Sequence, residues 1–369
     1  MVTAVVMPGP SQPLEVRSYP EPVLEPGAVL IRTIASEVCG TDVHLGAGQL
    51  AGVPYPIIPG HVSVGTVSAL GPRSGADGGP VTDINGVPVT LGARVTFLDV
   101  YGTCGRCWHC TVAGASTRCP HRRVYGVTMS ADEGLLGGWS EKIYLKPGTH
   151  ILVLPEELEW RTFMAAGCGM PTALHAATLA DIRFGDTVAV QGAGPVGLCA
   201  AALAQLRGAG QVILLGGPRE RLAAARSLGV DETIDVTTTT AAEREQAVRA
   251  RTNGRGADVT IEATGVPAAV AEGMRMTRDA GRYVVVGQYA NAGDVTINPH
   301  LDLNQKHLEV RGCWGSSVEH LYRSVRVLTR YQRRFDWQSM ISHEYSLSDA
   351  PQALADAAAQ RVVKALIVP

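Results

Sequence analysis

Residues 187–206 read TVAVQGAGPVGLCAAALAQL, and this stretch decides the fold. It places Gly192, Gly194 and Gly197 in G-x-G-x-x-G spacing, between an apolar run and a long stretch rich in Ala and Leu. In such a turn the first glycine makes the tight bend, the second lets the backbone approach a pyrophosphate, and the third allows close packing of helix on strand. Because a helix N-terminus attracts phosphate, we predict a dinucleotide-binding turn formed by Gly192, Gly194, Pro195, Val196 and Gly197.

The region that contains this turn alternates between apolar runs and stretches rich in Ala and Arg. The predicted strands are Thr187–Gln191, Gln211–Leu215, Thr233–Val236, Asp258–Ala263 and Arg282–Gly287, and the predicted helices include Val196–Arg207, Arg219–Leu228 and Ala241–Arg251. Continuous apolar strands separated by helices indicate a parallel sheet covered on both faces. A glycine-rich strand-to-helix turn can also occur without a ligand, but this alternation favours dinucleotide binding.

The N-terminal part of the chain follows a different pattern. Short aliphatic and β-branched runs, broken by Gly and Pro, predict the strands Ala28–Ile34, Gly65–Leu70 and Ala93–Asp99. Residues 71–92 are expected to form an exposed excursion in which Asn85-Gly86 marks a hairpin turn. After Gly315 the pattern is mixed again, and the chain ends in a strand-like KALIVP. The expected fold class is therefore α/β, with a β-rich part and a βαβ part.

Length and composition narrow the class of protein. The 369 residues suggest about two domains, and 46% hydrophobic and 18% charged residues are ordinary for a globular protein. A formal net charge of −2 gives no electrostatic case for nucleic acid or an anionic membrane as partner. No apolar run approaches the roughly 18–20 residues that span a bilayer, and the N-terminus does not resemble a signal peptide. We expect a cytoplasmic protein.

Four of the eight cysteines are clustered, at Cys104, Cys107, Cys110 and Cys119. Two-residue gaps let successive sulfur atoms converge on one centre, and four protein thiolates suit a closed tetrahedral zinc. Disulfides and inert core cysteines are the alternatives, but clustering in a chain of this size without a secretion signal favours metal. Because four protein ligands leave no open position, we predict a structural zinc.

The residues after the second strand of the βαβ part bear on which coenzyme is bound. An acidic residue that holds the ribose 2′-hydroxyl is expected there, but the strand runs into Gly216-Gly217-Pro218-Arg219. The missing carboxylate removes repulsion against a 2′-phosphate, and Arg219 or Arg221 could pair with that phosphate. We therefore favour NADP. NAD stays open, since both arginines could be solvated while backbone groups bind a hydroxyl.

Seven motifs follow one another in an order that resembles a known superfamily. They are CGTDVH (39–44), PGHVSVG (59–65), GTCGRCWHC (102–110), GGWSEK (137–142), GAGPVG (192–197), EATG (262–265) and VVVGQ (284–288). The chain resembles the zinc-containing medium-chain dehydrogenase/reductase superfamily of alcohol dehydrogenases, and its CGTD form is most similar to the polyol, threonine and secondary-alcohol branch. The resemblance implies a GroES-like catalytic domain of residues 1–168 and 316–369, with a structural-zinc loop at about 101–121, and a Rossmann coenzyme domain of residues 169–315.

The resemblance also implies the site residues. Cys39, His61 and Cys168 would bind a catalytic zinc, which as a Lewis acid lowers the pKa of a bound alcohol. Thr41 would take the alcohol proton and His44 would relay it to solvent, while Asp42 would orient His61. From the residues alone, Thr41 and Asp42 could instead cap a turn, since both types favour helix N-termini, but we favour the functional interpretation.

Further expectations concern the coenzyme, the substrate and the assembly. Gly216, Gly265 and Lys364 are assigned to the coenzyme by resemblance, with Lys364 near the pyrophosphate. Leu45, Tyr101, Met129 and Trp314 are candidates either for an apolar pocket or for the core. We expect two zinc ions per chain, NADP or NAD, a small alcohol or ketone substrate, and a homodimer or homotetramer in which the strand Leu308–Trp314 could pair between subunits.

One position departs from the family pattern. The family usually has Gly-His-Glu, but this chain has Gly60-His61-Val62, so a metal-exchange step that uses that glutamate is unavailable. Hydride transfer between a secondary alcohol and its ketone remains the predicted reaction. The alternatives are reduction of a C=N or activated C=C bond on the same fold and, more remotely, a non-catalytic nucleotide-binding protein.

Overall fold

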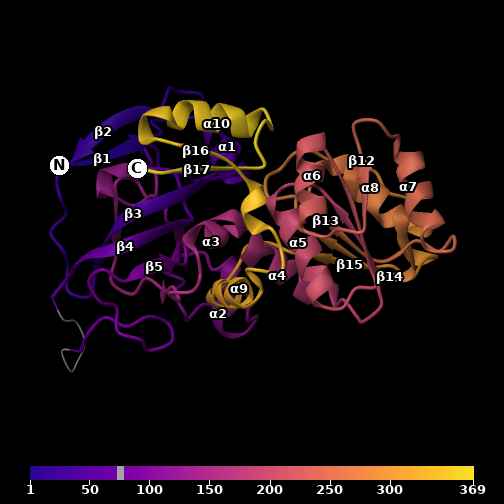
Figure 1. Ribbon diagram of the computed structural model, residues 1–369, viewed down its shortest axis with the longest axis horizontal. Coiled ribbons are helices and arrows are strands. Elements are labelled where there is room, and N and C mark those ends of the chain that lie inside the picture. Colours follow the sequence, from indigo (N-terminus) through magenta and orange to yellow (C-terminus); the bar gives the residue numbers. More distant parts are fainter. Residues whose placement is uncertain (73–78) are drawn as a thin grey trace. The chain divides into compact units, whose positions relative to one another are not determined.

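The computed structural model describes residues 1–72 and 79–369, which form two compact units (Figure 1). The first unit contains residues 1–167, 317–329 and 341–369, and the second contains residues 168–316 and 330–340. Each unit has its own sheet and its own core, and the two are described separately. Within the described residues, no helix has both the length and the apolar character needed to cross a membrane.

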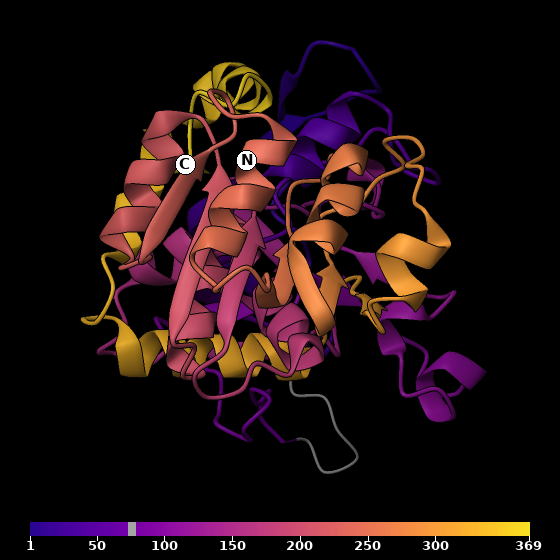
Figure 2. The ribbon, with the colours of Figure 1, turned by 90° about the vertical axis from the view of Figure 1, so that its right-hand side faces the viewer.

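A parallel sheet forms the centre of the second unit, as predicted, and it has six strands rather than the five named from the sequence pattern (Figure 2). In spatial order the strands are β12 (Glu232–Asp235), β11 (Gln211–Gly216), β10 (Thr187–Gln191), β13 (Ala257–Glu262), β14 (Thr277–Val285) and β15 (Glu309–Gly312). The chain thus starts in the middle of the sheet, proceeds to one edge, returns and continues to the other, which is the strand order of Rossmann folds. Ligands bind where this order reverses, beyond the carboxyl ends of β10 and β13.

Helices cover this sheet because its strands are apolar on both faces. The helices are α4 (Gly169–Ala180), α5 (Pro195–Leu206), α6 (Arg219–Ser227), α7 (Ala241–Ala250) and α8 (Pro267–Met276), with the short helices η3 (Pro299–Asn304) and η4 (Trp337–Met340). Helix α5 contacts both α4 and α6, whereas α7 contacts α8. Helix α7 begins at a capping box, in which the Thr240 hydroxyl accepts from the Glu243 N–H and the Glu243 carboxylate accepts from the Thr240 N–H.

The first unit is built on a largely antiparallel sheet. In spatial order its path is β16 (Ile341–Tyr345), β17 (Lys364–Ile367), β3 (Val29–Val38), β4 (Ser63–Leu70), β5 (Arg94–Phe97) and β9 (Ile151–Val153), and β8 (Lys142–Leu145) also pairs with β3. Two smaller sheets consist of β1 (Val2–Val6) with β2 (Glu15–Tyr19) and β6 (Val100–Tyr101) with β7 (Arg123–Val124). Strand β3 lies almost entirely inside, which explains its aliphatic sequence.

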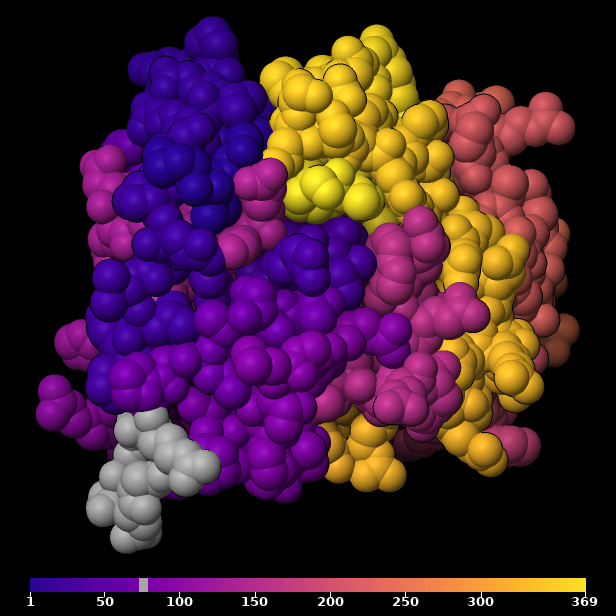
Figure 3. Space-filling view, turned by 60° about the vertical axis from the view of Figure 1, so that its left-hand side comes forward, coloured from indigo at the N-terminus to yellow at the C-terminus, as the bar shows by residue number. Residues whose placement is uncertain are grey.

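Short helices complete the first unit. They are α1 (Gly40–Gly46), α2 (Trp108–Thr111), α3 (Trp160–Ala166), α9 (Val318–Tyr331), whose last two residues belong to the second unit, and α10 (Ala350–Ala358), with η1 (Ser116–Arg118), η2 (Ala131–Glu133) and η5 (Leu347–Asp349). Figure 3 shows residues of the C-terminal segment packed beside the N-terminal residues, and α10 contacts α1, β17 and β3. The C-terminal segment is therefore an integral part of this unit.

The predicted excursion between β4 and β5 contains the expected turn. The Asp83 carboxylate accepts hydrogen bonds from the N–H groups of Asn85 and Val87, and Gly86 has a φ of +78°. A bridge between Thr82 and Pro88 closes the turn. Residues 73–78 of this excursion lie outside the described part of the chain.

Candidate functional site

The glycine-rich turn joins β10 to α5 with a different constraint at each glycine. Gly192 has a φ of +112°, and a Cβ atom there would stand 2.6 Å from the Ala263 carbonyl oxygen. A Cβ atom at Gly197 would stand 1.9 Å from the Gly192 carbonyl oxygen, so this residue lets the helix pack closely. Gly194 precedes the first residue of α5, and a Cβ atom there would meet nothing within 4 Å. The space in front of this helix N-terminus suits a phosphate group.

The end of β11 holds the residues assigned to the adenosine ribose. A Cβ atom on Gly216 would stand 2.5 Å from Ala193 Cβ, so the turn itself occupies the space of a side chain. Arg219 is exposed at the start of α6. The Arg221 side chain is partly buried, and burial lowers its pKa.

A buried carboxylate that we did not predict organises the neighbouring turns. Glu262, the last residue of β13, accepts hydrogen bonds from the N–H groups of Thr264 and Gly265 at 2.7 and 2.9 Å through Oε1, and from Gly287 N–H at 3.0 Å through Oε2. It thereby joins the loops after β13 and β14 at the carboxyl edge of the sheet. The recognisable signal is a glutamate that ends an apolar strand within the EATG motif. The N–H group of Gly265, a residue assigned to the coenzyme, is therefore hydrogen-bonded to Glu262 within the protein.

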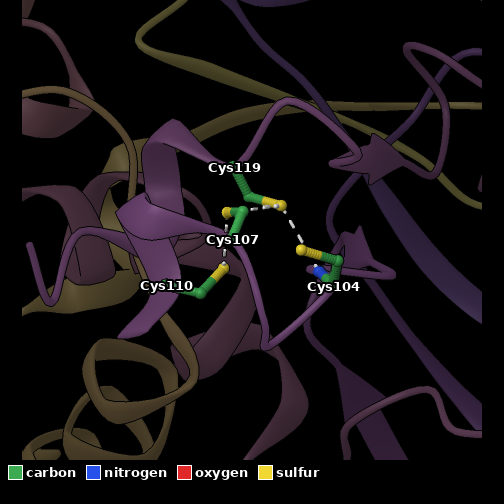
Figure 4. A group of neighbouring side chains, drawn as sticks. All are labelled: Cys104, Cys107, Cys110 and Cys119. Atoms are coloured by element: carbon green, nitrogen blue, oxygen red, sulfur yellow. Dashed lines mark hydrogen bonds between the residues drawn. The ribbon is translucent and has the colours of Figure 1, made fainter. Parts of the chain in front are cut away.

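The four clustered cysteines converge at one point, as Figure 4 shows. Their sulfur atoms lie within 4.8 Å of one another, and Cys107 Sγ is 3.5 Å from Cys110 Sγ and 3.9 Å from Cys119 Sγ. Four sulfur ligands at tetrahedral zinc lie about 3.8 Å apart, which follows from the Zn–S bond length. The Arg106 N–H group, as the main cause, lowers the pKa of Cys104 to about 6. The geometry and the donor set fit a structural zinc.

Cys39, His61 and Cys168 form a second cluster. Each offers one ligand atom, and these atoms lie within 4.8 Å of one another. Cys39 Sγ is 3.8 Å from His61 Nε2, close to the separation of about 3.6 Å for a sulfur and a nitrogen ligand of tetrahedral zinc. Cys168 directly follows Gly167, the last residue of the longest segment of the first unit. Two thiols and an imidazole fit zinc and leave one position for a water or substrate oxygen.

Local hydrogen bonds hold two of these ligands in place. Cys39 is the N-cap of α1, and its sulfur accepts from Thr41 N–H at 3.3 Å. The fully buried Asp42 carboxylate accepts from Cys39 N–H at 2.9 Å and from Gly60 N–H at 3.3 Å. Asp42 thus holds the backbone on either ligand segment, whereas the resemblance implied that it orients the imidazole. His61 Nδ1 is buried and has no hydrogen-bond partner among the described residues.

Buried acidic groups surround the imidazole. Burial, followed by the nearby Cys39, raises the pKa of Asp42 to about 8. Burial alone would lower the pKa of His61, but Cys39 and Asp42 outweigh it and raise that pKa well above its ordinary value. A divalent cation bound at this cluster would favour the ionised forms of Cys39 and Asp42.

Helix α1 carries the two residues assigned to proton transfer. Thr41 and His44 are three residues apart and therefore lie on one helix face, and both are partly exposed. His44 Nδ1 lies 2.5 Å from Gln49 Oε1, a contact that sequence reasoning missed. With Gln49 Oε1 as the acceptor, Nδ1 carries the proton and Nε2 is left to accept one.

The remaining candidates divide between the core and other contacts. Lys364, assigned by resemblance to the pyrophosphate, is completely buried, and its ammonium lies 2.7 Å from Glu37 Oε1. Leu45 and Met129 are core residues. Tyr101 donates a hydrogen bond to the Pro147 carbonyl at 3.3 Å, and Trp314 stacks on Tyr289 with ring centres 5.8 Å apart.

Comparisons with known proteins agree with this geometry. The alcohol dehydrogenase GroES-like domain matches residues 25–156 and the zinc-binding dehydrogenase family matches residues 195–330. The chain is 33% identical to 5-exo-hydroxycamphor dehydrogenase of Pseudomonas putida over 360 residues, which is 95% of each chain.

Solved structures show the same fold. An alcohol dehydrogenase from Thermotoga maritima superposes with a TM-score of 0.91 at 32% identity, covering 100% of this chain and 99% of its own. A zinc-binding dehydrogenase from Sinorhizobium meliloti, bound to NADP, has a TM-score of 0.85 at 27% identity with the same coverage. The chain therefore belongs to the zinc-containing medium-chain dehydrogenase/reductase superfamily of alcohol dehydrogenases, which are oxidoreductases that act on CH–OH groups.

Proposed function

We propose that this enzyme interconverts a secondary alcohol and its ketone with NADP, using a catalytic zinc at Cys39, His61 and Cys168 and a structural zinc at the four clustered cysteines. The observation that carries the proposal is the convergence of two thiols and one imidazole beside α1. This set has one ligand fewer than tetrahedral zinc requires, so a substrate oxygen has a place to bind. The four-cysteine set leaves no such place.

Bound zinc supplies Lewis acidity toward the alcohol oxygen, and the nicotinamide supplies the hydride chemistry. The chain provides the acid–base route. As the Thr41 hydroxyl accepts the alcohol proton it releases its own, and His44 accepts a proton on the nitrogen opposite the Gln49 contact and then gives one to solvent. Asp42 keeps the segments of Cys39 and Gly60 together during this transfer.

The preference for NADP is supported by the end of β11. Gly216 offers no carboxylate to repel a 2′-phosphate, and Arg219 is an exposed cation at the adjoining helix start. Arg221 is a weaker candidate, because its side chain is partly buried. The relative from Sinorhizobium meliloti is bound to NADP, which is consistent with this preference.

A homodimer or homotetramer in the cytoplasm is the assembly that we propose. Among the described residues, β15 pairs only with β14 and so forms an edge of its sheet, and Val310 on it is exposed. An unpaired edge of this kind is a template for pairing with a second copy. Light scattering of the purified protein tests this proposal, and a monomer would contradict it.

Metal counting together with a substrate panel tests the proposed reaction. We expect two zinc ions per wild-type chain, one per Cys39→Ser chain, and turnover of secondary alcohols or ketones by the wild type alone. The panel is run with NAD and NADP separately and includes imines and activated alkenes. Turnover of imines or alkenes without turnover of ketones would refute the proposed reaction. Two metals and full activity in Cys39→Ser would refute the proposed site.

A further inference from the structure

An ion pair that the proposed reaction does not use lies completely buried in the first unit. Lys364 Nζ is 2.7 Å from Glu37 Oε1, and both side chains are 0% exposed. Removing two charges from water is costly, and their attraction offsets that cost only with good geometry. A buried ion pair in this setting is therefore weak evidence for a role in stability alone.

Strand register places this pair beside a metal ligand. Strand β17 pairs antiparallel with β3, with Ala365 opposite Val38 and Leu366 opposite Glu37. The last pair of this register is Ala365 with Val38, and the next residues on the two segments are Lys364 and Cys39, the N-cap of α1. Residues opposite each other across a ladder share a face, and so do residues two apart on one strand. Glu37, Cys39 and Lys364 therefore share one face of the sheet.

The Glu37 residue also contacts the other two ligand segments. Its backbone N–H donates to the Val62 carbonyl at 3.0 Å, directly after His61. A Cβ atom at Gly167, directly before Cys168, would stand 2.0 Å from Glu37 Oε2 and 2.4 Å from Lys364 Nζ. Gly167 also has a φ of +45°, so only glycine fits there without strain. Glu37 thus contacts the chain beside His61 through its backbone, and the ion pair lies against Gly167, which directly precedes Cys168.

We propose that Glu37 is a positioning residue that holds the Lys364 ammonium away from the Cys39 thiolate and so preserves the affinity of this site for zinc. Two thiolates and a neutral imidazole balance the charge of one zinc ion, and the Glu37–Lys364 pair is itself neutral. Without Glu37, a buried ammonium beside Cys39 would attract the thiolate and repel the metal. Charges in such a buried region are poorly screened by salt. The inference rests on the catalytic zinc of the proposed function.

Opposite effects of two substitutions distinguish this role from a structural one. Glu37→Gln removes the carboxylate charge that lies 2.7 Å from the Lys364 ammonium, and we expect the catalytic zinc to leave about tenfold faster. Lys364→Met removes the ammonium but keeps the Glu37 carboxylate, which attracts the cation, so zinc release should be no faster than in wild type. A pair that merely stabilises the fold would make both variants lose metal faster.

The experiment measures zinc release from the two-zinc protein to a chromogenic chelator. The phase of zinc release that is missing in Cys39→Ser is assigned to the catalytic zinc. Release of the zinc bound by the four clustered cysteines serves as an internal control. The double variant Glu37→Gln/Lys364→Met removes both charges of the pair, so it tests the inference even where a single variant does not fold. We expect it to release zinc at the wild-type rate.

Equal acceleration in both single variants, or faster release from the double variant, would overturn the proposal. Failure of the underlying site has a different signature. One zinc in the wild type, or two in Cys39→Ser, refutes the catalytic site itself. Two zincs in the wild type and one in Cys39→Ser, with release unchanged in Glu37→Gln, refutes only the role of Glu37.

Discussion

Gly216 and Ala193 are so close that a Cβ atom on Gly216 would stand 2.5 Å from Ala193 Cβ and 2.8 Å from Ala193 N. The end of β11 is therefore packed directly against the glycine-rich turn. The absence of an acidic residue at this position is thus coupled to the shape of that turn.

Gly216→Asp is accordingly expected to fail as a conversion to NAD. The new side chain would displace Ala193, which lies between the first two glycines of the turn, so kcat/KM should fall with both coenzymes. The measurement is steady-state kinetics with NAD and NADP, and circular dichroism checks that the variant is folded. A gain in kcat/KM with NAD would contradict this reading of the contact.

Arg219→Ala should separate the two coenzymes. A charge-assisted hydrogen bond to a 2′-phosphate contributes about 1.5–3 kcal/mol, so kcat/KM with NADP should fall about 10- to 100-fold while the value with NAD changes little. Arg323→Ala, which removes an exposed arginine on α9, is the matched control. Equal losses with both coenzymes would remove Arg219 from phosphate recognition.

Asp42→Asn should weaken the catalytic zinc site selectively. An asparagine keeps the size but offers one acceptor oxygen for the two N–H groups of Cys39 and Gly60. Loss of such a group typically lowers metal affinity about 10- to 100-fold. Zinc content after dialysis against a chelator is the measurement, and the exposed Asp132→Asn is the control. Retention of both zinc ions would show that these two hydrogen bonds do not support the metal.

Cys119→Ser should remove the structural zinc. Four thiolates lie within 4.8 Å, and loss of one opens the closed ligand set. Because metal binding contributes to folding, residues 104–119 should become sensitive to limited proteolysis. Burial raises the pKa of Cys313 to about 12, so its thiol is neutral, and Cys313→Ala should keep both zinc ions. An undiminished zinc count in Cys119→Ser would contradict the assignment.

The ion pair of Asp258 predicts a pH-dependent contribution to stability. Burial opposes ionisation of this carboxyl, but hydrogen bonds from Arg278 at 2.6 Å and Thr187 N–H at 2.7 Å lower its pKa below the ordinary 3.8. A lowered folded-state pKa stabilises the fold above pH 3.8, and this contribution is lost as the pH falls through the folded-state value.

Asp258→Asn should therefore lower the free energy of unfolding by about 1–2 kcal/mol at pH 7, with a smaller difference in acid. Denaturant unfolding at pH 7 and at acidic pH measures this difference in the free energy of unfolding, with the exposed Asp294→Asn as the control. A difference that stays constant with pH would rule out the charge as its origin.

Sequence patterns were sufficient to predict most of the fold, because the periodicity of apolar residues and the spacing of glycines are set by residues that are neighbours in the chain. The strand predicted at Thr187–Gln191 matches β10 at both ends, and the other four of that sheet match to within a few residues at most boundaries. The largest difference is β14, which begins at Thr277 rather than Arg282. Of the extra residues, Thr277 pairs with Ala257 of β13, and a register shift that hydrophobicity does not reveal separates this pair from the rest.

The amino-acid sequence by itself determined the parallel sheet, its glycine-rich turn and the four-cysteine cluster, whose members lie close together in the chain. It also indicated Cys39, His61 and Cys168 through resemblance. Only the tertiary structure decided that Asp42 binds two backbone N–H groups, that Gly216 leaves no space for a side chain, and that Lys364 pairs with Glu37, 327 residues away. These contacts depend on strand register and packing between distant segments, and no local pattern of residues encodes either.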